Sequence, residues 1–148
     1  MTPALHHPSL PMRGHRAAAA LLTVNAIVLG LLSLFGLTVD LASCFRGIGP
    51  FGEIFLHSPL AIGVVEAHGL AFLLAAAALL LGARSGEPRW HLVFASVHLL
   101  LGSANIAFFA VFELAGHPLG GVAVTVLHFA FVALQSAAAA VRWRPAQN

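Results

Sequence analysis

Residues 17–41 read AAAALLTVNAIVLGLLSLFGLTVDL, an apolar run whose one ionisable side chain is Asp40, near its end. A helix needs about 20 mostly apolar residues to cross the hydrocarbon core of a bilayer, and this run is long enough. Three further segments meet the same test, at residues 58–82, 90–113 and 118–141. Glycine, proline and polar residues separate these segments. The sequence therefore predicts an all-α protein, a four-helix transmembrane bundle.

The composition of the whole chain favours the same class. Of its 148 residues, 59% are hydrophobic and 8% are charged, and the mean hydropathy is +0.94. A soluble domain carries about 25% charged residues, so this chain has too few to cover a surface in water. The pI near 10.1 comes from scattered arginines, and we expect no nucleic-acid partner. Cys44 is the one cysteine, which excludes an intrachain disulfide and a dithiol redox pair.

We predict a disordered cytoplasmic tail over residues 1–16, a single transmembrane domain over 17–143 and a cytoplasmic tail over 144–148. The arginines that fall on one side of the four predicted spans are Arg13, Arg16, Arg84, Arg89, Arg142 and Arg144. The opposite side carries Arg46 alone. Because basic residues concentrate on the cytoplasmic side, both termini are predicted to be cytoplasmic. Alanine, glycine and arginine are frequent and lysine is absent, which is typical of a GC-rich bacterial gene and predicts the bacterial inner membrane.

Three histidines lie deep within the apolar segments, at His68, His98 and His128, thirty residues apart. Ionisable residues are rare in spans because a charge at the bilayer centre costs about 3 kcal/mol or more. A neutral imidazole avoids that cost and can hold a haem or a metal, or relay a proton. At a rise of 1.5 Å per residue, His68 and His128 lie about 20 Å from the cytoplasmic ends of their helices, whereas His98 lies about 10 Å from its own. We therefore expect a pair near the midplane and an offset third histidine.

Other polar residues share these depths and faces. By the same rise, Asn105 lies in the deeper layer, and Asn25 and Gln135 lie in the layer of His98. His98 and Asn105 are seven residues apart, as are His128 and Gln135, so each pair shares a helix face. Glu66 and His68 point in different directions, so one of them must face a neighbouring helix or a second protomer.

Four interpretations of this polar interior remain open. His68 and His128, with His98 as an alternative, could ligate a b-type haem, because such a haem needs two histidines facing each other at one depth. The same residues could hold a metal ion. Glu66, His68 and His128 could relay protons. Neutral histidines could instead bond Asn105, Glu66 or the backbone and hold the helices together.

A second candidate site is an outer cluster, at the ends of the spans away from the arginine-rich side. Its members are Asp40, Glu53, His57, Glu113 and His117. Mixed carboxylate and imidazole ligands suit Zn²⁺ or Cu²⁺, and simple solvation is the alternative.

The overall plan resembles that of DoxX-like small four-helix bacterial membrane proteins. The resemblance is carried by Leu29-Gly30-Leu31-Leu32-Ser33-Leu34-Phe35-Gly36 and by the helix end and basic turn from Leu79 to Trp90. It implies this topology and gives no indication of an activity.

Taken together, these features favour a non-enzymatic integral membrane protein that binds a small ligand or a partner subunit through its polar interior. The alternatives are a haem- or quinone-linked electron carrier and a proton-coupled transporter. The partners predicted are the lipid bilayer and either a second copy of the chain or another membrane subunit. No nucleophile motif points to an enzyme.

Overall fold

A computed structural model describes residues 12–59, 61–82 and 86–142, and this part of the chain contains helices and no strands. The long helices are α1 (Met12–Arg46), α3 (Ala61–Ala77) with its π-helical extension η1 (Ala78–Gly82), α4 (Pro88–Ala107) and α6 (Pro118–Arg142). These four helical segments are long and apolar enough to cross a membrane. The predicted all-α class with four helices of membrane-spanning length is thereby confirmed.

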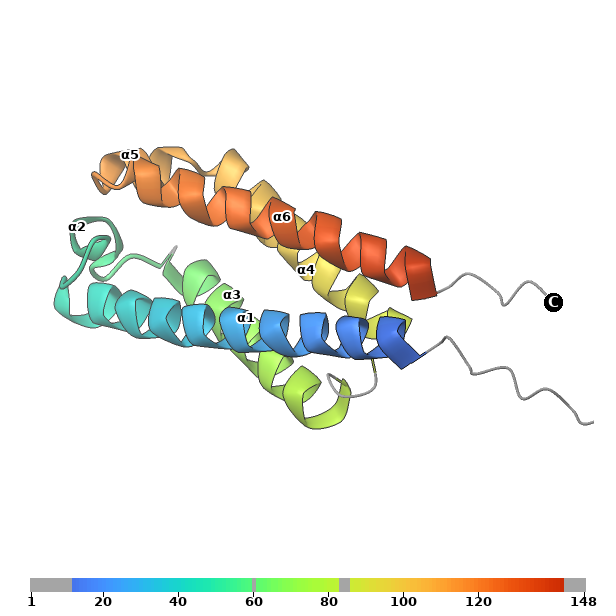
Figure 1. Ribbon diagram of the computed structural model, residues 1–148. Coiled ribbons are helices and arrows are strands. Elements are labelled where there is room, and N and C mark those ends of the chain that lie inside the picture. The colour runs from blue at the N-terminus through green and yellow to red at the C-terminus, as the bar shows by residue number, and fades with distance from the viewer. Residues whose placement is uncertain (1–11, 60, 83–85, 143–148) are drawn as a thin grey trace, which may run out of the picture.

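The four helices run alternately up and down (Figure 1). Helix α1 begins and α6 ends at one end of the bundle, which we call the terminal end. The short helices α2 (Gly52–Phe55) and α5 (Ala110–Leu114) lie at the opposite end, which we call the loop end. Helices α3 and α6 therefore both run from the loop end to the terminal end.

Several helix boundaries differ from the sequence-based prediction by up to six residues, and α1, for example, ends at Arg46, five residues beyond the predicted end of the first span. Helix α1 begins at Met12, so residues 12–16 are helical and not part of a disordered tail. Helix α4 ends at Ala107, well before the predicted end of the third span, because Phe108 leaves the helical conformation with φ −112° and ψ 28°. The apolar character of the chain continues through Phe108 and Phe109, so composition gave no sign of this break. Residues 1–11 and 143–148 lie outside the described residues.

The helices pack in two pairs. Helix α1 packs mainly on α3, and α4 packs mainly on α6 (Figure 1). Small side chains line the α1–α3 contact, where Ala26 and Ala75 are fully buried and a methyl group on Gly30 would lie 3.4 Å from the Ala75 Cβ. Small residues let helices in a membrane approach closely and gain dispersion contacts. Phe94 of α4 is also buried in this cluster and brings the second pair against the first.

The loop end is closed by aromatic side chains. Phe51 stacks on Phe55 with ring centroids 5.4 Å apart and meets Phe112 of α5 edge-on at 6.2 Å. Helix α2 can fold back here because Gly52 lies against the backbone carbonyl of Gly47, where any side chain would collide. The connection from α1 to α3 thus ties the two helix pairs together at this end.

Ala75→Leu should lower the free energy of unfolding by about 1–3 kcal/mol, because the added atoms have no room between α1 and α3. Ala130→Leu, on an exposed part of α6, adds the same atoms and should leave stability nearly unchanged. Unfolding both variants by SDS titration in mixed micelles measures the difference. Equal stability of the two variants would contradict the packing described for Ala75.

Candidate functional site

The interior of the bundle contains a set of buried polar side chains on three of its long helices. The buried polar residues are Asn25, Ser33, Asp40, Ser43, His91, His98 and Gln135. A buried polar group is stable in an apolar environment only when it is hydrogen-bonded, so the bonding partners of these residues define the arrangement.

His98 on α4 is the centre of this arrangement. Its Nε2 lies 2.8 Å from Oδ1 of Asn25 on α1, and its Nδ1 lies 2.9 Å from Nδ1 of His128 on α6. Because the amide oxygen only accepts, the Nε2–H of His98 donates to Asn25. In a neutral ring Nδ1 of His98 then accepts, and Nδ1–H of His128 donates to it. One side chain thereby joins three helices, and we call Asn25, His98 and His128 the histidine network.

Aromatic and small residues fix the two rings of the network in place. Phe131, on α6, stacks on the His98 ring at 4.9 Å between centroids and 13° between planes. Gly102, on α4, leaves space for the neighbouring helix, since a methyl group there would lie 3.2 Å from the His128 Cβ. The close α4–α6 approach therefore allows direct contact between the two histidines.

A second imidazole–amide contact lies closer to the terminal end. Nδ1 of His91 lies 2.5 Å from Oε1 of Gln135, so that this nitrogen donates and the amide oxygen accepts. Gln135 Nε2, like Asn25 Nδ2, is buried and has no hydrogen-bond partner among the described residues. Leaving such a donor unpaired costs about 1–3 kcal/mol.

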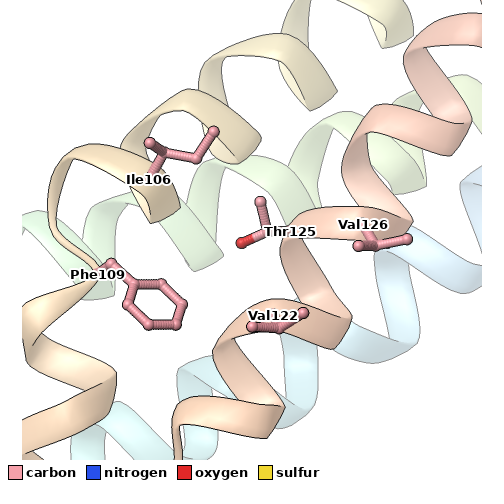
Figure 2. Close-up of a pocket in the computed structure, with 5 residues that line it drawn as sticks. All are labelled: Ile106, Phe109, Val122, Thr125 and Val126. Atoms are coloured by element: carbon pink, nitrogen blue, oxygen red, sulfur yellow. The ribbon is translucent and has the colours of Figure 1, made fainter.

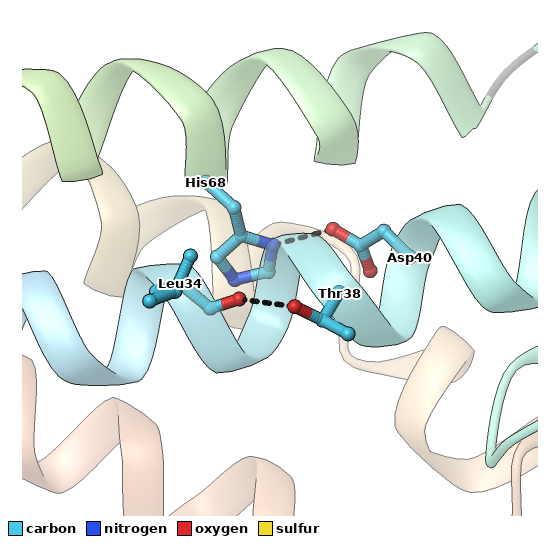
Figure 3. A network of polar contacts seen from close by, with 4 residues as sticks. All are labelled: Leu34, Thr38, Asp40 and His68. Atoms are coloured by element: carbon cyan, nitrogen blue, oxygen red, sulfur yellow. Dashed lines mark hydrogen bonds and ion pairs between the residues drawn. The ribbon is translucent and has the colours of Figure 1, made fainter.

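The third contact joins α3 to α1. Nδ1 of His68 lies 2.5 Å from Oδ2 of Asp40, and Figure 3 shows the imidazole reaching across from its helix to the carboxylate. The Asp40 side chain is 3% exposed, whereas that of His68 is 39% exposed. The carboxylate holds the proton on Nδ1 and leaves Nε2 as the free acceptor of the neutral ring.

His68 fits against α1 because position 36 is a glycine. A methyl group on Gly36 would lie 2.6 Å from Nε2 of His68, which is too close for any real contact. Nearby, Thr38 donates to the carbonyl of Leu34 at 2.9 Å, a bond within α1 that satisfies its hydroxyl (Figure 3). The hydroxyl of Thr38 is therefore engaged locally, and His68 takes Asp40 as its partner.

The predicted layer of Asn25 and His98 is confirmed by their direct bond. The predicted midplane pair is arranged differently, because His128 bonds His98 and His68 bonds Asp40.

Two predicted interior residues stand apart from the network. Glu66 is exposed, and Asn105 is half-buried. Gln135, predicted in the layer of His98, bonds His91 nearer the terminal end. Depth alone therefore did not identify which polar residues meet.

Asp40 was predicted in an outer cluster and is instead buried against His68. The sequence could have predicted this burial, because Asp40 lies four residues after Gly36 and continues the helix face that also carries Asn25. The other members of the cluster, Glu53, His57, Glu113 and His117, are exposed. Among the described residues, no three His, Cys, Asp or Glu side chains come together in a way that could hold a metal ion. The structure does not assemble the predicted outer metal site.

The geometry of the network does not fit a haem between His98 and His128. Two axial histidines lie on opposite faces of the macrocycle, with the iron between their nitrogens. Here the two rings bond each other directly, with centroids 5.2 Å apart. No planar group can lie between them in this arrangement.

A shallow apolar groove lies on the surface of the bundle. It is lined by Ile106, Phe109, Val122, Thr125 and Val126 (Figure 2). The hydroxyl of Thr125 donates to the carbonyl of Gly121 at 2.7 Å, so it is already engaged. This groove includes none of the buried polar residues.

Comparison with known proteins gave no match: no family model, no curated protein and no solved structure is similar to this chain. The resemblance to DoxX-like proteins therefore stays a prediction. The candidate site is defined by its own contacts.

A double-mutant cycle should detect the bond between Asn25 and His98. Asn25→Ala and His98→Ala are each expected to destabilise the protein, and their coupling energy should lie between about 0.6 and 1.7 kcal/mol, the average and the largest values for hydrogen bonds between membrane helices. The measurement is SDS unfolding of the two single variants and the double variant. The pair Asn25→Ala and Gln135→Ala, which share no bond, serves as the control and should couple negligibly. A coupling no larger than that of the control would contradict the assigned bond.

Proposed function

We propose that the protein moves protons through the membrane along its buried histidines. The observation that carries this proposal is the direct bond between His98 and His128 inside an apolar four-helix bundle. Imidazole is the side chain that both gives and takes a proton near neutral pH, and two bonded imidazoles form a donor–acceptor chain. Intramembrane ionisable residues are characteristic of proton relays in pumps and transporters.

The histidines are distributed along the bundle in a way that supports this proposal. Counted from the terminal end, His91 lies about 4.5 Å along its helix, His98 about 15 Å, and His128 and His68 about 21 Å. Beyond them, Asp40 lies toward the loop end and is bonded to His68. The successive positions are separated by about one to two helical turns.

The hydrogen bond between the two rings defines one proton-transfer step, from His128 to His98. A proton taken up by Nε2 of His128 makes that ring cationic, and its Nδ1–H can pass to Nδ1 of His98. His128 is then neutral, and His98 holds the extra proton. The Asn25 amide oxygen that accepts from Nε2–H cannot take this proton up, so His98 releases it to a water molecule once that hydrogen bond breaks. His68 and the Asp40 carboxylate form a second donor–acceptor contact, between Nδ1–H and Oδ2.

Histidines that only hold helices together would have the same bonds but no need to change protonation state. Glutamine can supply both a donor and an acceptor to neighbouring groups, yet an amide does not exchange a proton near neutral pH. Substitution by glutamine therefore separates a relay from a purely structural role.

For the direction of insertion, we propose cytoplasmic termini in a bacterial inner membrane. The support is the arginine distribution, since Arg16 and Arg89 lie at the terminal end and Arg46 lies at the loop end. Green fluorescent protein fused after Asn148 should be fluorescent, and alkaline phosphatase at the same site should be inactive. The same two reporters inserted after Gly116, at the loop end, should give the reverse result. Active phosphatase at the C-terminus would overturn the orientation.

His98→Gln and His128→Gln should each reduce proton flux by about tenfold or more, because positioned proton-transfer groups contribute factors of this size or larger. The measurement is quenching of a pH-sensitive dye in proteoliposomes driven by a potassium diffusion potential. His117→Gln, at an exposed position of the loop end, is the control and should conduct like the wild type. Circular dichroism confirms that each variant is folded. Wild-type flux equal to that of empty liposomes, or full flux in a folded His98→Gln variant, would overturn the proposal.

A further inference from the structure

Glu66 is the exception among the ionisable side chains in the apolar parts of the spans, residues 17–41, 61–82, 90–107 and 118–141. The other such groups, Asp40, His68, His91, His98 and His128, are buried or half-buried within the bundle. Glu66 is exposed on the outer surface of α3, and no hydrogen bond or ion pair joins it to another described residue. In a membrane this surface faces lipid unless another molecule covers it.

The position of Glu66 makes lipid an unfavourable neighbour. Glu66 lies about 7.5 Å along the helix from Ala61, and the segment Ala61–Gly82 is about as long as the hydrocarbon core is thick. Carboxylates within spans almost always face a bundle interior or a partner group, because lipid offers no hydrogen bond. A partner that bonds the Glu66 carboxyl would therefore gain substantially from binding here.

The surface around Glu66 is shaped for a helix. Ile62 and Leu70 flank it on the same face at a spacing of four residues, and both are well exposed. Gly63 lies between them, and no other atom lies within 4 Å of the place where its Cβ would be. A second helix can therefore come close to the α3 backbone beside the carboxyl. We call Ile62, Gly63, Glu66 and Leu70 the Glu66 face.

We propose that the Glu66 face binds a second copy of this chain, forming a symmetric dimer through α3. The two-fold axis of such a dimer runs along the membrane normal and brings each residue near its own copy at the same depth. The two Glu66 carboxyls then meet, and one protonated carboxyl donates a hydrogen bond to the other, with the pair retaining at most one charge.

The charge distribution of the chain favours this pairing over an ion pair. The apolar parts of the four spans, residues 17–41, 61–82, 90–107 and 118–141, contain no arginine or lysine. A second copy therefore offers no arginine or lysine side chain within these ranges to Glu66, and its matching carboxyl is the polar group that symmetry places at the required depth. Dimerisation satisfies both carboxyls without a second kind of subunit.

Cysteine cross-linking tests the face directly in native membranes. In a Cys44→Ser background, Leu70→Cys should give a cross-linked dimer with a short bis-maleimide. Val126→Cys, on α6, is the matched control, because Val126 is 62% exposed and Leu70 is 66% exposed. Both residues lie about 12–14 Å from the loop-end start of their helices. Val126 should give no dimer.

Substitutions of Glu66 test the chemistry of the contact. Glu66→Leu should lower the dimer fraction by about fivefold or more, and Glu66→Gln should preserve it, because paired amides still bond between helices. Subunit counting by single-molecule photobleaching in dilute liposomes measures both. Three outcomes would each overturn the proposal: cross-linking at Val126 in place of Leu70, a monomeric wild type, or a Glu66→Leu variant that dimerises like the wild type. Cross-linking of Leu70 to a different protein would equally overturn it.

Discussion

A polar group within a membrane must find its hydrogen bonds inside the protein, and His98 shows how this constraint organises the bundle. Its two ring nitrogens contact α1 through Asn25 and α6 through His128, so α4 is fixed relative to both neighbours. Apolar packing cannot provide this orientation alone, because lipid tails contact leucine as favourably as another helix does. Phe131 stacks on the His98 ring, and Gly102 lets α6 approach α4 closely. Both features keep the rings of His98 and His128 in contact.

Asp40 and Glu66 carry the same functional group and have opposite environments. Asp40 is buried and bonded to His68, whereas Glu66 lies on the outside of α3. A neighbouring helix of the same chain satisfies the first carboxyl, and the second requires another molecule. This contrast separates the interior, where we place proton movement, from the surface, where we place assembly.

Hydropathy and length were sufficient to predict the helix number and class, because lipid imposes a strict length on apolar segments. The shared layer of Asn25 and His98 followed from counting depth along a regular helical rise, but the bond between them was not predicted. The pairing of His128 with His98 did not follow, because it depends on helix rotation and on the close approach allowed by Gly102. The burial of Asp40 was missed for a related reason: depth placed it near the helix end, but only the face it shares with Gly36 places it against α3.

The pairing of α1 with α3 and of α4 with α6 has a consequence for biosynthesis. Each pair is a hairpin of consecutive long helices, so its contacts join residues that are near in sequence. Such local contacts close small loops and form early, and N-terminal segments emerge from the ribosome first. The first hairpin can therefore assemble in the bilayer before α6 is synthesised. The bond between Asn25 and His98 then forms as a late docking step, in which the second hairpin is aligned on a finished first one.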